Sequence, residues 1–345
     1  MHLQTLLNLQ HPLIQAPMAG VQNSTLAIAV SSTGALGSLP CAMLTPETLD
    51  QELRTIRDKT ANPVNLNFFA HQPPVLDRGR AAVWKGLFGH YYHELEIDPD
   101  AFPPGPMRMP FNDDMADVLC AYPPKVVSFH FGLPDGYLLD RVRSTGAKIL
   151  SSATTVEEAI WLEQQGVDAI IAQGVEAGGH RGMFLSDDIS TQIGTFALLP
   201  QVLDAVKVPV IAAGGIADAR GVKAAVDLGA AGVQVGTAYL CCPEATTSAI
   251  HRAALQSPQA RHTALTNIYS GRPARGIVNR MMRELGPMNP LAPAFPLATA
   301  ASAPLRAKAE SQGSGDFTPL WSGQNASGCK PIPAADLTRE LLSLL

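Results

Sequence analysis

Short apolar runs of strand length recur along most of the chain, and segments with helical spacing separate them. The runs lie at residues 12–20, 35–39, 63–69, 125–132, 147–152, 168–173, 208–215 and 231–237. An apolar strand followed by a helix and another apolar strand is typical of parallel βα units. Eight such units in one chain predict an α/β fold of the TIM (β/α)8 barrel type, with the strands at its centre.

Residues with strong boundary preferences mark the ends of the predicted helices. Ser24 and Asp218 are expected to cap two of them, because their side-chain oxygens accept hydrogen bonds from free backbone N–H groups. Thr45 followed by proline predicts the start of another helix. A glycine that ends a helix just before a strand recurs along the chain, as expected for similar repeated units, at Gly146, Gly166 and Gly229.

The regular alternation is interrupted once and stops after residue 240. We expect the barrel domain to span residues 1–240, with an insertion after the third strand at 71–124. This proline-rich stretch is too long for a simple connection, so it is expected to wrap the barrel or cover the site. Residues 241–315 are expected to form a smaller helical cap that binds substrate. Residues 316–345 are expected to return to the barrel.

Composition and charge exclude several classes of function. The 345 residues are 46% hydrophobic and carry a net charge of -5 without a basic tract, so neither nucleic acid nor an anionic membrane is an expected partner. No run approaches the roughly 18 apolar residues of a membrane span, and no signal peptide is recognised. Five scattered cysteines indicate a cytoplasmic protein without a disulfide framework. The histidines show no ligand spacing, so no metal site is expected. A monomer or a homodimer is expected.

Active sites of TIM barrels lie at the carboxyl ends of the strands, so the residues that follow each strand are the candidates for chemistry. The sixth strand is followed by Gly178 and Gly179 and then by His180. Glycine lets the backbone approach a flat or charged ligand closely because it has no Cβ, and histidine transfers protons near neutral pH. We expect His180 to be the catalytic residue, above a cofactor that lies against the two glycines.

The seventh and eighth strands end in loops suited to a phosphate group. Gly214 and Gly215 precede the helix start at Asp218, and Gly236 and Thr237 follow the eighth strand. In many barrels these two loops bind phosphate through backbone N–H groups. Tight turns without a ligand would give a similar pattern, but its presence in both loops favours the phosphate site.

A phosphate site, amide side chains and a wall of small residues together suit a flat phosphorylated ring, and FMN fits best. Its pyrimidine edge requires amide donors and acceptors, whereas its dimethylbenzene edge requires an apolar wall. The cofactor-binding residues predicted on this basis are Pro17, Met18, Ala19, Asn67, Gln173, Gly178, Gly179, Gly214, Gly215, Gly236, Thr237 and Gln324.

The sequence allows two roles for each of the other candidate site residues. His130 lies between two phenylalanines on the fourth strand and faces either into the barrel or outward, so it is a candidate substrate residue. Arg272 and Arg275 either bind an anionic substrate or clamp the cap to the barrel, and the role of Lys308 is open in the same way. Trp321 either closes over the cofactor or anchors the tail.

These residues resemble the bacterial class I branch of the nitronate monooxygenase family, formerly called 2-nitropropane dioxygenases. The resemblance covers nearly the whole chain, and its most specific motif is the stretch at residues 173–182, QGVEAGGHRG. Further matching stretches lie at residues 15–20, 128–132, 213–216, 234–237 and 270–276.

The resemblance implies FMN as cofactor, a TIM barrel with a helical second domain, and no nicotinamide in turnover. It implies that alkyl nitronates such as propionate 3-nitronate are oxidised with O2 to a carbonyl compound plus nitrite and nitrate. His180 would take the α-proton from a neutral nitroalkane or hold the nitronate by a hydrogen bond. The matching stretch at 234–237 adds Gln234 and Val235 to the predicted cofactor residues.

One departure from the family concerns the substrate. The resemblance implies tyrosines in the cap near the substrate, but this chain has no tyrosine after Tyr269, and Phe295 stands where one is expected. Phe295 is therefore a candidate substrate residue that lacks the hydroxyl group.

Three alternatives to this function remain at the level of sequence. An FMN-dependent NAD(P)H:quinone or enoyl-thioester reductase of the same barrel type needs no separate nucleotide motif. A barrel similar to inosine monophosphate dehydrogenase would need a nucleophilic cysteine after the sixth strand, and residues 173–182 contain none. A non-catalytic protein that binds flavin or a phosphate ligand is the third alternative.

Overall fold

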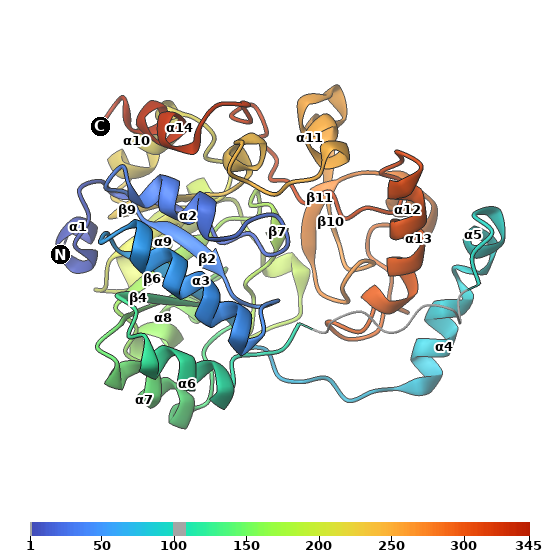
Figure 1. The fold of residues 1–345 in the computed structure, drawn as a ribbon, viewed down its shortest axis with the longest axis horizontal. Coiled ribbons are helices and arrows are strands. Elements are labelled where there is room, and N and C mark those ends of the chain that lie inside the picture. The colour runs from blue at the N-terminus through green and yellow to red at the C-terminus, as the bar shows by residue number, and fades with distance from the viewer. Residues whose placement is uncertain (1, 99–107) are drawn as a thin grey trace.

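Parallel strands form a closed barrel, and a second unit packs over one of its ends (Figure 1). The structure is a computed structural model that describes residues 2–98 and 108–345. The strand order is β1-β9-β8-β6-β5-β4-β3-β2. Hydrogen bonds between the edge strands close the sheet, because Leu36 N donates to Leu13 O at 2.9 Å and Gln15 N donates to Leu36 O at 2.8 Å. The predicted TIM barrel is therefore confirmed.

All eight predicted strands are present within the described residues. They are β1 (Leu13–Gln15), β2 (Gly37–Pro40), β3 (Val64–Phe69), β4 (Val126–His130), β5 (Lys148–Ala153), β6 (Ala169–Gln173), β8 (Val210–Ala213) and β9 (Gly232–Val235). The helices that surround them are α2 (Ser24–Ser31), α3 (Pro46–Lys59), α6 (Asp113–Ala121), α7 (Gly136–Ser144), α8 (Val156–Gln164), α9 (Thr195–Ala205), α10 (Ala219–Asp227) and α14 (Ala334–Leu342).

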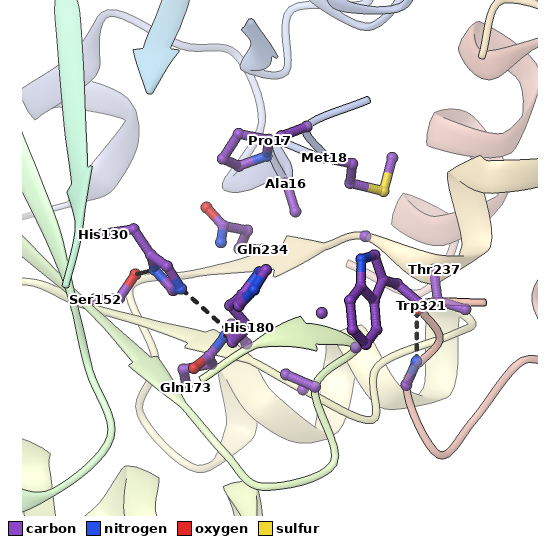
Figure 2. Close-up of a pocket in the computed structure, with 18 of the residues that line it drawn as sticks. Ala16, Pro17, Met18, His130, Ser152, Gln173, His180, Gln234, Thr237 and Trp321 are labelled. Atoms are coloured by element: carbon purple, nitrogen blue, oxygen red, sulfur yellow. Dashed lines mark hydrogen bonds between the residues drawn. The ribbon is translucent and has the colours of Figure 1, made fainter. Parts of the chain in front are cut away.

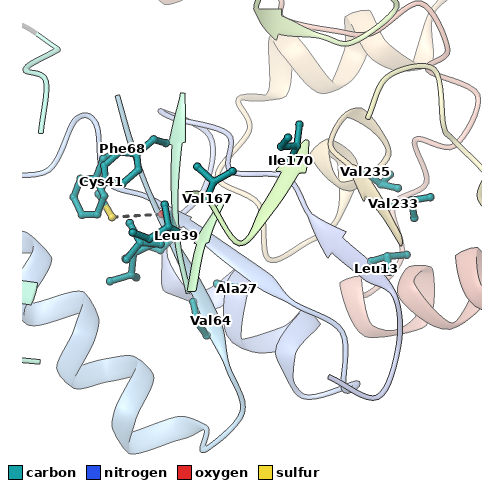
Figure 3. Close-up of a cluster of buried hydrophobic side chains, with 14 of the residues drawn as sticks. Leu13, Ala27, Leu39, Cys41, Val64, Phe68, Val167, Ile170, Val233 and Val235 are labelled. Carbon is teal, nitrogen blue, oxygen red and sulfur yellow. Dashed lines mark hydrogen bonds between the residues drawn. The ribbon is translucent and has the colours of Figure 1, made fainter. Parts of the chain in front are cut away.

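Two apolar layers stabilise the barrel. The larger layer fills the space between strands and helices, with Leu39, Phe68 and Val233 among its members (Figure 3). The smaller layer fills the barrel interior at the end opposite the cap, where Leu3 of α1 (Leu3–Leu7) packs against inward-facing strand residues such as Ile14. Burial on both faces explains why these strands read as continuous apolar runs in the sequence.

The helix boundaries agree with the cap predictions except at one residue. Thr45 accepts a hydrogen bond from Thr48 N, and Asp218 accepts one from Gly221 N. The predicted cap at Ser24 is wrong by one position, because the side chain of Asn23 accepts from Thr25 N and Ser24 is the first helical residue. Asparagine and serine are equally good caps, so composition alone does not decide between adjacent ones.

The eighth helix of the barrel comes from the end of the chain. After β9 the chain forms the short 3-10 helix η2 (Thr237–Cys241) and leaves for the cap. Helix α14 then packs between α10 and α2, where the eighth barrel helix belongs. The cap is therefore inserted between the last strand of the barrel and its last helix.

The second unit contains strands that the sequence analysis missed. The helices α11 (Ala249–Gln256), α12 (Arg280–Leu285) and α13 (Thr299–Ser311) fit a helical cap, but β10 (Thr263–Thr266) and β11 (Ala274–Ile277) pair as an antiparallel hairpin. A third short strand, β7 (Gly179–His180), follows β6 and pairs with β11. These strands are too short for their alternation to be visible in the sequence.

Part of the segment at 71–124 packs against the cap. Helices α4 (Arg78–Gly86) and α5 (Gly89–Glu94) lie beside α12 and α13 (Figure 1), and their aromatic side chains share a buried cluster with the cap. Helix α6, in the same segment, instead packs against α3 and α7 as a barrel helix, so the part that leaves the barrel is shorter than predicted. Among the residues that the structure describes, no helix is long and apolar enough to span a membrane.

We expect Leu3→Ala to destabilise the barrel from its closed end. Leu3 is fully buried, and truncation of a buried leucine costs about 2–5 kcal/mol of the free energy of unfolding. Urea denaturation of the variant measures this loss. The control is Leu344→Ala, at a residue that is 51% exposed and should change stability by less than about 0.5 kcal/mol. Equal effects of both substitutions would contradict the role assigned to α1.

Candidate active site

A cavity opens at the carboxyl ends of the barrel strands, beneath the cap (Figure 2). It brings together most of the predicted site residues, from segments far apart in the sequence. Those that line it are Pro17, Met18, Ala19, Asn67, His130, Gln173, Gly178, Gly179, His180, Gly214, Gly215, Gln234, Gly236 and Thr237.

Three predicted site residues do not line the cavity. Val235 packs in the core between strands and helices, because side chains alternate along a strand and Gln234 takes the inner face. The side chain of Gln324 is exposed, whereas its neighbours Gly323 and Asn325 line the cavity. Phe295 lies outside the lining as well, but its ring centroid is 5.3 Å from that of His180.

Glycines form the part of the cavity wall where two backbone segments pass close to each other. A Cβ on Gly178 would lie 2.5 Å from the backbone nitrogen of Gly323, so only glycine fits between these segments. Gly179 and Gly215 have φ angles of +71° and +72°, a conformation that favours glycine. Around Gly179 the place of a Cβ is open, so a flat ligand can approach the backbone there.

The C-terminal segment covers the two loops predicted to bind phosphate. Gly323 N donates a hydrogen bond to Oγ1 of Thr237 at 2.9 Å, and Asn325 Nδ2 donates to the carbonyl of Gly215 at 3.3 Å. The loops after β8 and β9 thus share one lid, and the segment predicted to return to the barrel forms part of the site.

One buried amide in the cavity lacks a protein partner. Oε1 of Gln234 is buried and accepts no hydrogen bond from any described residue. A buried polar atom without a partner is costly, so this acceptor indicates a ligand that donates a hydrogen bond. A flavin ring carries such a donor on its pyrimidine edge, and the residues present therefore fit FMN.

The other predicted amides also serve the protein itself. Gln173 donates from Nε2 to the carbonyl of His180 at 3.1 Å and accepts at Oε1 from Gly182 N at 2.8 Å. Asn67 Nδ2 donates to Oγ of Ser128 at 2.9 Å. Gln173 thus shapes the loop that follows β6 and carries His180, which we call the histidine loop, in addition to lining the cavity.

His180 lies at the centre of the cavity, between His130 and Trp321 (Figure 2). Its Nε2 is 2.8 Å from Oγ of Ser270. The Ser270 hydroxyl donates its proton to the carbonyl of Arg272 at 3.2 Å, so its oxygen accepts from Nε2–H of His180. In this tautomer Nδ1 has a free lone pair, and no described residue binds it.

The surroundings of His180 favour its neutral form. Burial lowers its pKa well below the usual value of 6.5, and the positive charges of Arg108 and Arg272 and the neighbouring rings of His130 and His71 lower it further. No carboxylate among the described residues raises the pKa of His180 in opposition to these effects. The imidazole is therefore an unprotonated acceptor at neutral pH, in a cavity that favours an anion.

His130 supports the histidine loop. Its Nε2 donates to the carbonyl of His180 at 3.1 Å, and its Nδ1 accepts from Oγ of Ser152 at 3.0 Å. Burial lowers the pKa of His130 to about 4. Because both ring nitrogens are engaged, the side chain predicted to contact substrate positions His180, although its ring still lines the cavity.

Aromatic side chains surround the imidazole of His180. The ring centroids of Phe69 and Phe131 are 6.3 and 6.0 Å from that of His180, and the Trp321 centroid is 5.5 Å from it. Trp321 also lines the cavity, so it faces the site as well as anchoring the tail. These rings shield part of the imidazole from solvent, and the rest of it faces the cavity.

The two arginines of the stretch at 270–276 act as clamps. Arg272 lies over the ring of Phe131, 4.2 Å from its centroid, and donates to the carbonyl of Met183 at 2.7 Å. Arg275 donates to the carbonyl of Val175 at 2.8 Å. Neither is part of the cavity lining, and the same holds for Lys308.

Several residues of the site had no clear signal in the sequence. Arg181 is fully buried and donates to the carbonyls of Gly174 and Gln173 at 2.7 and 2.6 Å, which ties the histidine loop to the end of β6. The only sequence signal for Ser270 is its position at the start of the stretch at 270–276, which is rich in glycine and arginine. Arg108 lines the cavity from the proline-rich segment, where no pattern marks it. Among the described residues, no group of three or more His, Cys, Asp or Glu side chains could hold a metal ion.

Comparison with known proteins places these features in one family. The family model "Nitronate monooxygenase" matches residues 1–343. The chain is 40% identical, over 99% of its length and 97% of the relative's, to a nitronate monooxygenase of Pseudomonas aeruginosa. A nitroalkane oxidase structure from Streptomyces ansochromogenes matches with a TM-score of 0.89 at 39% identity, covering 99% of this chain and 96% of that chain.

A more distant structure shares the architecture. FabK from Thermotoga maritima matches with a TM-score of 0.72 at 25% identity and covers 99% of this chain and 94% of that chain. The match to the family model extends over nearly every residue, and the sequence and structural likenesses agree with it. The chain therefore belongs to the nitronate monooxygenase family.

Proposed function

We propose that the protein uses FMN to oxidise alkyl nitronates of the propionate 3-nitronate type with O2, giving a carbonyl compound plus nitrite or nitrate. The observation that supports this most directly is the neutral imidazole of His180, whose Nδ1 is free in the cavity that also holds the glycine loops and the unpaired Oε1 of Gln234. The redox chemistry would come from bound FMN, which takes electrons from the nitronate and delivers them to O2.

The residues of the cavity divide between the parts of such a cofactor. Backbone N–H groups of Gly214, Gly215, Gly236 and Thr237 suit the phosphate group, because glycine-rich loops leave these donors accessible. The stretch from Pro17 to Ala19 and the open backbone at Gly179 suit the faces of the ring, and Gln234 suits its polar edge.

His180 moves the proton when the substrate is a neutral nitroalkane. Its Nδ1 takes the α-proton, while Nε2–H stays hydrogen-bonded to Ser270 and fixes the ring. The low pKa of His180 makes it a weak base, but the nitronate that forms is an anion close to the cations of Arg108 and Arg272. When the substrate is already a nitronate, no proton has to be removed.

We expect the purified protein to be yellow, and its flavin spectrum to bleach when propionate 3-nitronate is added with oxygen excluded. NADH should leave the spectrum unchanged. Absorption spectroscopy of an anaerobic titration measures both responses. Bleaching by NADH and not by the nitronate would instead support the quinone or enoyl-thioester reductase. A colourless protein that does not bind added FMN would contradict the cofactor.

We expect Gln234→Leu to weaken FMN binding, because the variant removes the unpaired Oε1 with little change in volume. The loss of a hydrogen bond in a buried site should raise the Kd by about tenfold, as measured by quenching of flavin fluorescence. The matched control is Gln201→Leu on the exposed side of α9, which should leave the Kd unchanged. Unaltered binding by Gln234→Leu would exclude this contact.

We expect His180→Asn to slow the oxidation of neutral nitroalkanes by about 10²–10⁴-fold, the usual contribution of a general base. Asparagine has no basic nitrogen, so preformed nitronates should be oxidised with a much smaller loss. Oxygen-consumption kinetics with both substrates measure the difference, and the spectrum reports retained flavin. The control is His262→Asn, at an exposed histidine. A non-catalytic flavin-binding protein would show no turnover in any variant.

The pH profile is a second readout of the same base. A protonated imidazole cannot accept a proton, and the pKa of His180 lies well below 6.5. Nitroalkane turnover, as kcat/KM, should therefore persist as the pH falls through 6.5 and decline only at lower pH. A decline centred near 6.5 would contradict the lowered pKa.

A further inference from the structure

A second cavity, which we call the cap chamber, lies beside the active site. Its lining includes Arg108, Ser270, Thr299, Ser302, Arg306 and Trp321. Arg108 and Trp321 line the active-site cavity as well, and Ser270 is the hydrogen-bond partner of His180. The chamber therefore begins next to the proposed catalytic histidine.

Helix α13 forms one long wall of the chamber. Small side chains, including those of Thr299, Ser302 and Ala303, face the chamber from its first turns, and Arg306 and Glu310 line it further along. From Thr299 to Glu310 the helix advances about 16 Å. The side chain of Arg306 is 46% exposed, so the chamber reaches solvent at that end. The chamber is longer than the three-carbon chain of propionate 3-nitronate can fill.

The chamber carries one positive charge that no described residue balances. Arg306 forms an ion pair with Glu310 at 2.8 Å. Nη1 of Arg108 donates to Oγ1 of Thr299 at 3.4 Å, and no described carboxylate acts on the Arg108 guanidinium. Two guanidinium groups and one carboxylate leave a net charge of one.

The electrostatics of Arg108 agree with this imbalance. Burial lowers its pKa, and the nearby charge of Arg306 lowers it further, while no carboxylate acts in the opposite direction. A partly buried cation without a partner is unfavourable, so the binding of an anionic ligand group beside Arg108 would lower the free energy of the complex. A guanidinium group pairs well with a carboxylate because two parallel N–H groups match its two oxygens.

We propose that the cap chamber binds the carboxylate end of ω-nitro acids longer than nitropropionate, with Arg108 as the carboxylate partner and Arg306 at the open end extending the range of chain lengths. The inference rests on the proposed function, since the nitronate end must lie at His180. A single excess charge matches one carboxylate, whereas a doubly charged phosphate group would need a second free cation.

Kinetics with two substrate series test the proposal. Nitronates of ω-nitro acids are compared with nitronates of uncharged nitroalkanes of equal length. We expect the acids to have kcat/KM values higher by at least about tenfold, the usual size of a charge-assisted contact, and this advantage to persist in acids longer than propionate 3-nitronate. Arg108→Gln should remove most of it through KM. The control is Arg339→Gln on the exposed surface of α14, which should keep the full preference.

A second variant tests the room in the chamber without changing its charge. Ala303→Leu places a larger side chain on the chamber wall. We expect the kcat/KM of long acids to fall by at least about tenfold relative to that of propionate 3-nitronate, because overfilling a site costs about as much as losing a contact. An equal effect on short and long acids would contradict binding of the tail in the chamber.

Binding without turnover separates this inference from the proposed function. Titration calorimetry of the FMN-loaded protein compares hexanoate with 1-hexanol, and we expect only hexanoate to bind, in a manner that Arg108→Gln abolishes. If no nitronate is oxidised but hexanoate binds in this way, the proposed function fails and the chamber assignment stands. If short nitronates are oxidised but hexanoate binds no better than 1-hexanol, or binds Arg108→Gln equally well, the chamber assignment is wrong.

Discussion

The carbonyl oxygen of His180 is the point on which the site depends. It accepts hydrogen bonds from Nε2 of His130 and from Nε2 of Gln173, both at 3.1 Å, so the ends of β4 and β6 hold the same atom. Arg181 fixes the next residue of the loop to the end of β6. With the backbone held in this way, a single contact with Ser270 is enough to orient the imidazole. Preorganisation of this kind places a proton acceptor without a cost at the moment of reaction.

The barrel alone supplies only the floor of this site. Ser270 and the aromatic ring of Phe295 come from the cap, and the backbone of Gly323 and the ring of Trp321 come from the segment after it. The connection is possible because the chain leaves the barrel after β9 and returns to supply α14 as the last barrel helix. The cap is thereby attached at both ends to the rim that holds the cavity, which keeps its contributions in register with those of the strands.

The charges around the cavity have one sign. Arg108 and Arg272 both lower the pKa of His180; the carboxylates of Asp187 and Glu158 act on Arg272, whereas no described carboxylate acts on Arg108. A protein pays for such an arrangement in stability, since like charges repel and buried cations lose hydration. The arrangement suits anionic ligands, because a nitronate, a phosphate group or a carboxylate each offsets part of that repulsion on binding. The same electrostatic feature thus connects the imidazole, the cofactor and the cap chamber.

Local pattern was sufficient for the barrel and for the most specific part of the site. Eight strands were recognisable because burial on both faces makes them continuously apolar, and His180 was recognisable because glycines that must pass close to other backbone precede it. Only the tertiary structure decided that Gln234 rather than Val235 faces the cavity, that Gly323 rather than Gln324 forms its wall, and that Arg108 reaches it at all. The hairpin of β10 and β11 and the place of α14 were decided in the same way. The physical reason is that a sequence records how each residue is buried and how its backbone turns, whereas contacts between distant segments depend on how the assembled elements pack.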